Sequence, residues 1–126
     1  MKKNILAVAI MFCTSCAFAG CSVATNVQET IFVCNNIAEY GKLVNTVRAV
    51  VTRDLDSMYV NKKYSDGTEY TKIVARDHNY GQGVFINSWV TDRYGVKTKR
   101  ESKLTGSFGQ ETMQEEYDSF LTEYGL

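Results

Sequence analysis

The second half of the chain carries the clearest pattern of apolar and polar positions: short β-prone runs separated by turn residues. Two of these runs flank Asp66-Gly67, a pair that readily adopts the positive φ angles of a two-residue hairpin turn. With this turn, Lys63 faces Tyr70 across the hairpin. The predicted faces carry Met58, Val60, Ile73 and Ala75 on one side and Tyr59, Tyr70 and Val74 on the other. Because neither face is uniformly apolar, we expect a sheet that is covered on one side and partly covered on the other.

Two more strands and a helix are predicted after this hairpin. Residues 84–91 alternate, with Phe85 and Trp89 on one face, and residues 96–104 are polar and rich in lysine, as is typical of an edge strand. Residues 111–124 are acidic but have apolar residues at helical spacing, which predicts an amphipathic C-terminal helix that closes the core over the sheet. Its apolar stripe consists of Met113, Tyr117, Phe120, Leu121 and Tyr124.

The first half of the chain gives a more ambiguous pattern. Thr25 and Gln28 have the spacing of a helix capping box, apolar residues follow at helical spacing, and Gly41 stands where a helix would end. These signals predict a helix over residues 26–40. The alternative is a strand over residues 30–35, which are rich in β-branched and aromatic side chains.

Residues 42–56 fit either a helical stripe or one face of a strand, and their many valines and threonines favour a strand. The elements together predict an α+β fold with an N-terminal helix, an antiparallel β-meander of four to five strands and a C-terminal amphipathic helix. The length is that of a single small domain, which we place at residues 21–126.

Residues 1–20 have the pattern of a secretory signal peptide. A short basic start is followed by an apolar run at residues 5–12 and by the cleavage signal Ala17-Phe18-Ala19. The apolar run is far shorter than the roughly 20 residues that span a bilayer. We therefore expect export, and the bacterial style of the leader indicates the periplasm or secretion as the destination.

The cysteines allow two different forms of the exported chain. Cys21 and Cys34 remain after cleavage, and in an oxidising compartment such a pair is expected to form a disulfide. The segment Phe18-Ala19-Gly20-Cys21 also resembles the lipobox of bacterial lipoproteins, although leucine is usual where this chain has Phe18. That resemblance implies lipidation of Cys21 and a membrane anchor, which would exclude the disulfide. A metal site is a weaker alternative, because two cysteines and one histidine leave a tetrahedral shell incomplete.

Composition and motifs argue against several classes of function. Without Lys2 and Lys3 the chain has 12 basic and 14 acidic residues, so it lacks the basic excess of a nucleic-acid-binding domain. His78 is the sole histidine, and its neighbour Asp77 would point to the opposite side of a strand. No cofactor, metal or nucleophile motif is apparent. We therefore predict a protein without catalytic activity, and an enzyme built on His78 remains the weakest alternative.

Aromatic residues are concentrated in the predicted hairpin region. Tyr59, Tyr70 and Trp89 are candidate binding residues, since tyrosine and tryptophan are enriched in protein interfaces, although they are also ordinary sheet residues. The leading interpretation is an exported module of the inhibitor, immunity or exclusion type that binds another envelope or secreted protein. The alternative is a structural lipoprotein that meets the membrane only through lipidated Cys21.

The intact mass of the mature protein distinguishes the two fates of Cys21. We expect the mass of a chain that begins at Gly20 and gains two hydrogens on reduction, because exported cysteine pairs are oxidised. A chain that begins at Cys21 and carries acyl groups would contradict the disulfide and show an anchored lipoprotein.

Overall fold

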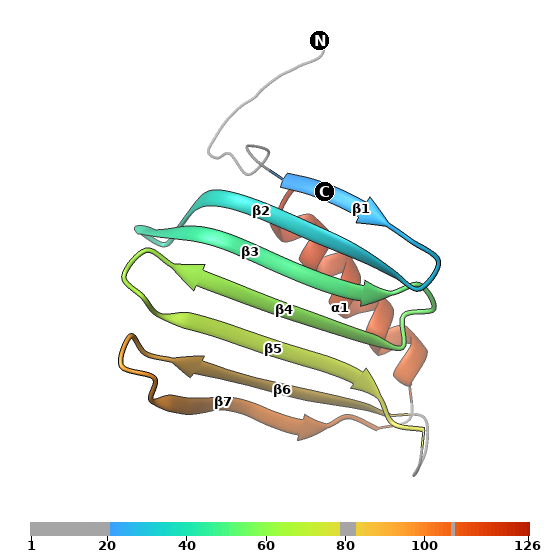
Figure 1. Cartoon of the computed structure of the whole chain (residues 1–126). Helices are drawn as coiled ribbons and strands as arrows, with labels where there is room; N and C mark the ends of the chain where they lie inside the picture. Colours follow the sequence, from blue (N-terminus) through green and yellow to red (C-terminus); the bar gives the residue numbers. More distant parts are fainter. Residues whose placement is uncertain (1–20, 79–82, 107) are drawn as a thin grey trace.

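The structure is a computed structural model that describes residues 21–78, 83–106 and 108–126 (Figure 1). The predicted signal peptide, residues 1–20, lies outside the described residues. Within them the chain forms seven strands and one helix. The strands are β1 (Cys21–Thr25), β2 (Glu29–Glu39), β3 (Lys42–Thr52), β4 (Ser57–Tyr64), β5 (Glu69–Arg76), β6 (Val84–Thr91) and β7 (Lys97–Leu104), and the helix is α1 (Gly109–Glu123).

All seven strands belong to one antiparallel sheet, and their order in the sheet is their order in the chain. Helix α1 lies across one face of this sheet, behind the strands in Figure 1. The predicted antiparallel meander with a C-terminal helix is therefore confirmed in outline. The predicted number of four to five strands is wrong, because the N-terminal part of the chain adds strands where a helix was expected.

The helix predicted over residues 26–40 is wrong, and the alternative strand over residues 30–35 is confirmed within β2. What resembled a capping box is a turn in which the Asn26 side chain accepts hydrogen bonds from the backbone N–H groups of Gln28 (2.8 Å) and Glu29 (2.9 Å). This turn leads β1 directly into β2. The β-branched and aromatic residues of β2 are then stabilised by pairing with β1 and β3 rather than by a helical stripe.

Gly41 belongs to a hairpin turn and not to the end of a helix. Tyr40 (φ 50°) and Gly41 (φ 80°) both have positive φ, as a type I′ turn between β2 and β3 requires. The strand favoured for residues 42–56 is confirmed as β3. Its pairing with β4 is interrupted by an irregularity between Val44 and Thr46.

The hairpin predicted at Asp66-Gly67 is confirmed as β4 and β5, but its register differs from the prediction by one residue. Lys62, and not Lys63, lies opposite Tyr70. The Tyr64 N–H donates to the Thr68 carbonyl, so the loop that these two residues close contains three residues, 65–67, in place of two, and Gly67 takes a positive φ of 92° at its end. This conformation is typical of a three-residue hairpin loop.

The shift of one residue changes which side chains of the hairpin share a face. Met58 lies opposite Val74, and both are buried beneath the helix. Ile73 and Ala75 were predicted on the same face as Met58, but they lie on the opposite side of the sheet, where Ile73 faces Tyr59.

The core lies between α1 and the sheet face that it covers. Met113, Phe120 and Tyr124 of the predicted helical stripe are buried, together with apolar residues of β2 to β6. The ring of Phe120 packs edge-on against Phe32 at 5.4 Å between centroids and lies 5.0 Å from the ring of Tyr124. Burying a phenylalanine contributes roughly 1.5–3 kcal/mol, so these rings fix the helix on the sheet.

The two edges of the sheet are protected in different ways. The edge strand predicted over residues 96–104 is confirmed as β7, whose side chains are mostly charged or polar and exposed. At the other edge β1 is short and largely exposed. No helix in the described part of the chain is long and apolar enough to cross a membrane.

A disulfide between Cys21 and Cys34 ties β1 to the rest of the sheet, as predicted. The two cysteines lie directly opposite each other in the ladder, and Cys34 is fully buried. Because the other β1 side chains are exposed, the disulfide is the principal covalent and packing anchor of this strand.

We expect Cys21→Ala to lower the free energy of unfolding by about 3 kcal/mol, since the disulfide closes a short loop in the unfolded chain. The backbone amides of β1 should also exchange hydrogen faster. Urea unfolding and hydrogen exchange measure the two effects, and Ser22→Ala, an exposed change in the same strand, is the matched control. Equal midpoints for Cys21→Ala and Ser22→Ala under oxidising conditions would contradict this role of the disulfide.

Candidate functional site

The face of the sheet turned away from α1, which we term the open face, carries a row of side chains that crosses every strand. Residues directly opposite each other in antiparallel strands share a face, so the register defines the row. It runs through Ala24, Ile31, Val50, Tyr59, Ile73, Asn87 and Ser102. The row is apolar or aromatic from β1 to β5, and Tyr59 is 37% exposed. A solvent-facing sheet surface normally carries polar residues, so this row is a candidate contact surface.

A hollow of about 500 Å³ lies next to this row, over β5, β6 and β7. Trp89 and Ile73 contribute its apolar surface, and its charged groups are Lys97, Lys99 and Glu101, so its net charge is positive. The Lys97 ammonium lies 5.3 Å from the centre of the Trp89 ring, within the range of a cation–π contact. The hollow can therefore receive an apolar side chain beside a negative charge.

The three candidate binding residues do not lie together. Tyr59 and Trp89 are on the open face, because they pair with Ile73 and Thr71 respectively. Tyr70 lies opposite Lys62 on the other side of the sheet, where it lines a second cavity.

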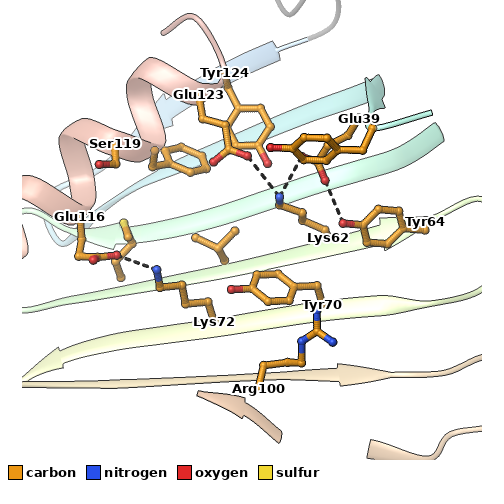
Figure 2. Close-up of a pocket in the computed structure, with 14 residues that line it drawn as sticks. Glu39, Lys62, Tyr64, Tyr70, Lys72, Arg100, Glu116, Ser119, Glu123 and Tyr124 are labelled. Atoms are coloured by element: carbon orange, nitrogen blue, oxygen red, sulfur yellow. Dashed lines mark hydrogen bonds and ion pairs between the residues drawn. The ribbon is translucent and has the colours of Figure 1, made fainter. Parts of the chain in front are cut away.

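This second cavity, the helix-side cleft, has a volume of about 320 Å³ and lies between the C-terminal half of α1 and the sheet (Figure 2). Met58, Val60 and Phe120 form its apolar part. Polar and aromatic residues line the rest of it: Glu39, Tyr40, Lys62, Tyr64, Tyr70, Lys72, Arg100, Glu116, Ser119, Glu123 and Tyr124.

Two lysines within the cleft are neutralised by carboxylates. The Lys62 ammonium lies 3.0 Å from Glu39 and 3.4 Å from Glu123. The Lys72 ammonium lies 2.8 Å from Glu116. Glu39 also accepts a hydrogen bond from the Tyr64 hydroxyl at 2.9 Å, so the carboxylate links a lysine to a tyrosine.

Burial and neighbouring charges shift the ionisation of these groups. Burial alone would lower the pKa of Lys62, but Tyr124, Glu123 and Glu39 outweigh that effect and raise it. Burial raises the pKa of Tyr124, and the nearby Lys62 only partly offsets this.

The other lysine–carboxylate pair and the tyrosine bound to Glu39 behave in the same way. Burial would lower the pKa of Lys72, but its hydrogen bond and ion pair with Glu116 raise it. Burial and the hydrogen bond to Glu39 raise the pKa of Tyr64. All four groups therefore hold their protons more tightly in the folded protein.

Two polar groups of the cleft have no partner among the described residues. The Tyr124 side chain is 1% exposed and its hydroxyl, which points toward Lys62 in Figure 2, meets no group at hydrogen-bonding geometry. The Arg100 guanidinium forms no hydrogen bond or ion pair with any other described residue. Both groups can still bind a ligand.

The sequence did not identify these cleft residues as a group. The predicted register, which was one residue out, placed Tyr70 on the face opposite Met58 and Val60, and Glu39 lay in a predicted helix. One sequence feature could have indicated the cleft: Met58, Val60 and Lys62 are alternate residues of β4 and share a face, so a lysine stands where a third apolar residue would be expected.

His78 lies away from both cavities. Its Nε2 atom contacts the Asp56 carboxylate, and both side chains are largely exposed. In the part of the chain that the structure describes, no group of three histidine, cysteine or acidic residues is arranged to hold a metal ion.

No family model matches the chain, and neither the curated proteins nor the solved structures contain a significant match to it. Its function is therefore inferred from the two surfaces themselves.

The raised pKa values of Lys62, Lys72, Tyr64 and Tyr124 predict a loss of stability at alkaline pH. The ordinary pKa is 10.0 for tyrosine and 10.5 for lysine, and at a pH below these values the four groups are protonated in the folded and in the unfolded protein. At a higher pH the unfolded chain releases protons that the folded protein keeps, so the free energy of unfolding falls.

We expect the free energy of unfolding in urea to fall as the pH rises from about 10 to 12. Tyr124→Phe should reduce the slope by one proton, about 1.4 kcal/mol per pH unit. Tyr94→Phe, at an exposed turn, should leave the slope unchanged. An equal slope in wild type and Tyr124→Phe would show that Tyr124 ionises normally in the folded protein.

Proposed function

We propose that the protein is a small exported binding module that acts through its open face on another envelope or secreted protein. It would bind that partner and block its action, as inhibitors, immunity proteins and exclusion factors do, and it would catalyse no reaction. The observation that supports this proposal is the apolar row on the open face, with the Trp89 hollow beside it.

A sheet surface suits such a role because it is rigid before binding. Tyr59 and Trp89 stand on paired strands, so little conformational freedom is lost when they are covered. Large aromatic residues in a desolvated contact usually contribute most of the binding energy of an interface. Trp89, at the hollow, is therefore the expected centre of the contact.

The charges around this surface define the partner. Four cations, Arg48, Lys63, Lys97 and Lys99, lie on the open face by the register of their strands. Two carboxylates of the sheet share this face, Glu29 and Glu69, and Glu69 is directly opposite Lys63, so the face is net positive and the cations at the hollow lie apart from both carboxylates. Lys97 and Lys99 border the hollow itself. The complementary partner presents an apolar or aromatic side chain flanked by carboxylates. A second copy of this chain fits less well, since a two-fold contact would bring the same basic side chains together.

The leader pattern and the disulfide support a periplasmic or secreted location. The disulfide uses the Cys21 sulfur that a lipid anchor would need, so it favours the free form over the lipoprotein. Disulfides of this kind persist in oxidising compartments.

A photocrosslinking residue at position 59 tests the proposal in cells that export the full chain. We expect one discrete protein to be crosslinked at position 59 and not at position 94, which lies in an exposed turn. That protein is then purified, and its affinity is measured by calorimetry. Trp89→Ala should weaken binding by about 30-fold or more, which corresponds to a hot-spot residue.

Tyr70→Ala is the matched control, because Tyr70 is an aromatic residue on the opposite face of the same sheet. It should change the affinity by less than about threefold. If the purified protein binds wild type and Trp89→Ala equally, the open face is not the binding surface. If position 59 crosslinks only to a second copy of the chain, the open face is a dimer interface.

A further inference from the structure

We propose that the helix-side cleft is a separate binding site for a short peptide of two or three residues with free termini and an apolar side chain. The cleft opens on the side of the sheet that carries α1, opposite the Trp89 hollow, so this site does not depend on the proposed function.

The cations of the cleft, Lys62, Lys72 and Arg100, come from the strands, and two of its three carboxylates, Glu116 and Glu123, come from α1. The third carboxylate, Glu39 of β2, brings the carboxylates to the same number as the cations. Lys62 and Lys72 are held in ion pairs, whereas Arg100 on β7 lies apart from them and Glu123 is half exposed. The balanced charge, with a cation at one end and an accessible carboxylate at the other, favours a zwitterion over a simple anion or cation.

Arg100 provides the end of the cleft that binds a carboxylate. It is the cation of the cleft that no described carboxylate neutralises, since Lys62 and Lys72 are both paired. A guanidinium presents two parallel N–H groups that match the two oxygens of a carboxylate. The C-terminal carboxylate of a peptide fits this group.

Glu123 provides the end that binds an ammonium. Its side chain is 51% exposed and only 3.4 Å from Lys62, so it retains capacity for a second cation. It stands in the last turn of α1, where the helix dipole is negative and where α1 has no basic residue.

The rings of Tyr70 and Tyr124 already bind the Lys62 ammonium at 5.6 and 5.7 Å, and such rings attract cations. The Tyr124 hydroxyl, which faces Lys62 without a well-formed hydrogen bond, lies at the same end and can accept a hydrogen bond from an ammonium or a peptide N–H.

The distance between the two ends sets the length of the ligand. Glu123 contacts Lys62 of β4, and Arg100 is on β7, three strand spacings away, or roughly 14 Å between backbones. Both side chains are long and reach inward, but a single amino acid carries both charges on one carbon and cannot bridge them. Three extended residues span about 10 Å. Met58, Val60 and Phe120 can receive an apolar side chain between the ends.

Isothermal calorimetry with the mature, disulfide-bonded protein and the tripeptide Ala-Phe-Ala tests this site. We expect saturable binding. N-acetylation or C-amidation should weaken it about tenfold or more, because each removes one charge-assisted contact. Phenylalanine alone should also bind about tenfold more weakly or worse, because it is too short to contact both ends of the cleft.

Arg100→Gln should weaken binding of the free peptide about tenfold and should abolish the difference between the free and the amidated peptide. Lys99→Gln, the neighbouring residue on the open face, should change neither. Because Arg100 is exposed and has no described partner, its replacement should not unfold the protein, which circular dichroism checks.

Two results would overturn the proposal: no saturable binding of Ala-Phe-Ala up to about 10 mM, well above the range of specific sites of this size, or equal affinity for the free and the amidated peptide. Trp89→Ala should bind the tripeptide like wild type, so failure at the open face and failure at the cleft are distinguishable.

Discussion

A seven-stranded sheet has two large faces, and the described chain has one helix to cover them. At a strand spacing of about 4.8 Å the sheet is roughly 30 Å wide, whereas a helix of 15 residues is about 22 Å long and 10 Å across. Helix α1 therefore covers a diagonal band of one face and leaves the other face bare (Figure 1). Both candidate sites follow from this incomplete coverage of the sheet. The open face is the surface that no described helix covers, and the cleft is the part of the covered face that α1 does not fill.

Two lysines on the helix-covered face show how the chain fills the part of that face that α1 does not cover. Lys62 and Lys72 lie on the covered face beside the buried residues Val60 and Val74, and each is held by a carboxylate of α1 or β2. Partly buried pairs of this kind are worth little net stability, because desolvation offsets most of the attraction. An apolar pair would serve the fold equally well. The polar cleft therefore accords better with a binding role than with a purely structural one.

The sequence was sufficient where the local signal agreed with the long-range pairing. The strands at 84–91 and 96–104 and the C-terminal helix were predicted correctly for this reason. The N-terminal helix was not, and the buried residues of β2 show why. Phe32 and Cys34 follow the two-residue period of a strand, but Asn36 has a positive φ of 57° and breaks the period, so Ile37 is the next buried residue. The two-residue period is therefore too short to exclude the helical spacing of Val27, Ile31, Cys34 and Ala38, on which the predicted helix rested. Only the pairing with β1 and β3 resolves that ambiguity.

The same reasoning explains why the candidate binding residues were only partly grouped. An Asp-Gly pair fits a two-residue and a three-residue loop, and the choice between them moves every side chain of a strand to the other face. With the observed register, the alternation in β4 places Tyr59 on the open face and Lys62 in the cleft. The mixed character of this hairpin was therefore the informative signal. A strand that serves only the core would be apolar on one side and polar on the other, whereas β4 and β5 depart from that rule on both sides, and the two departures coincide with the two cavities.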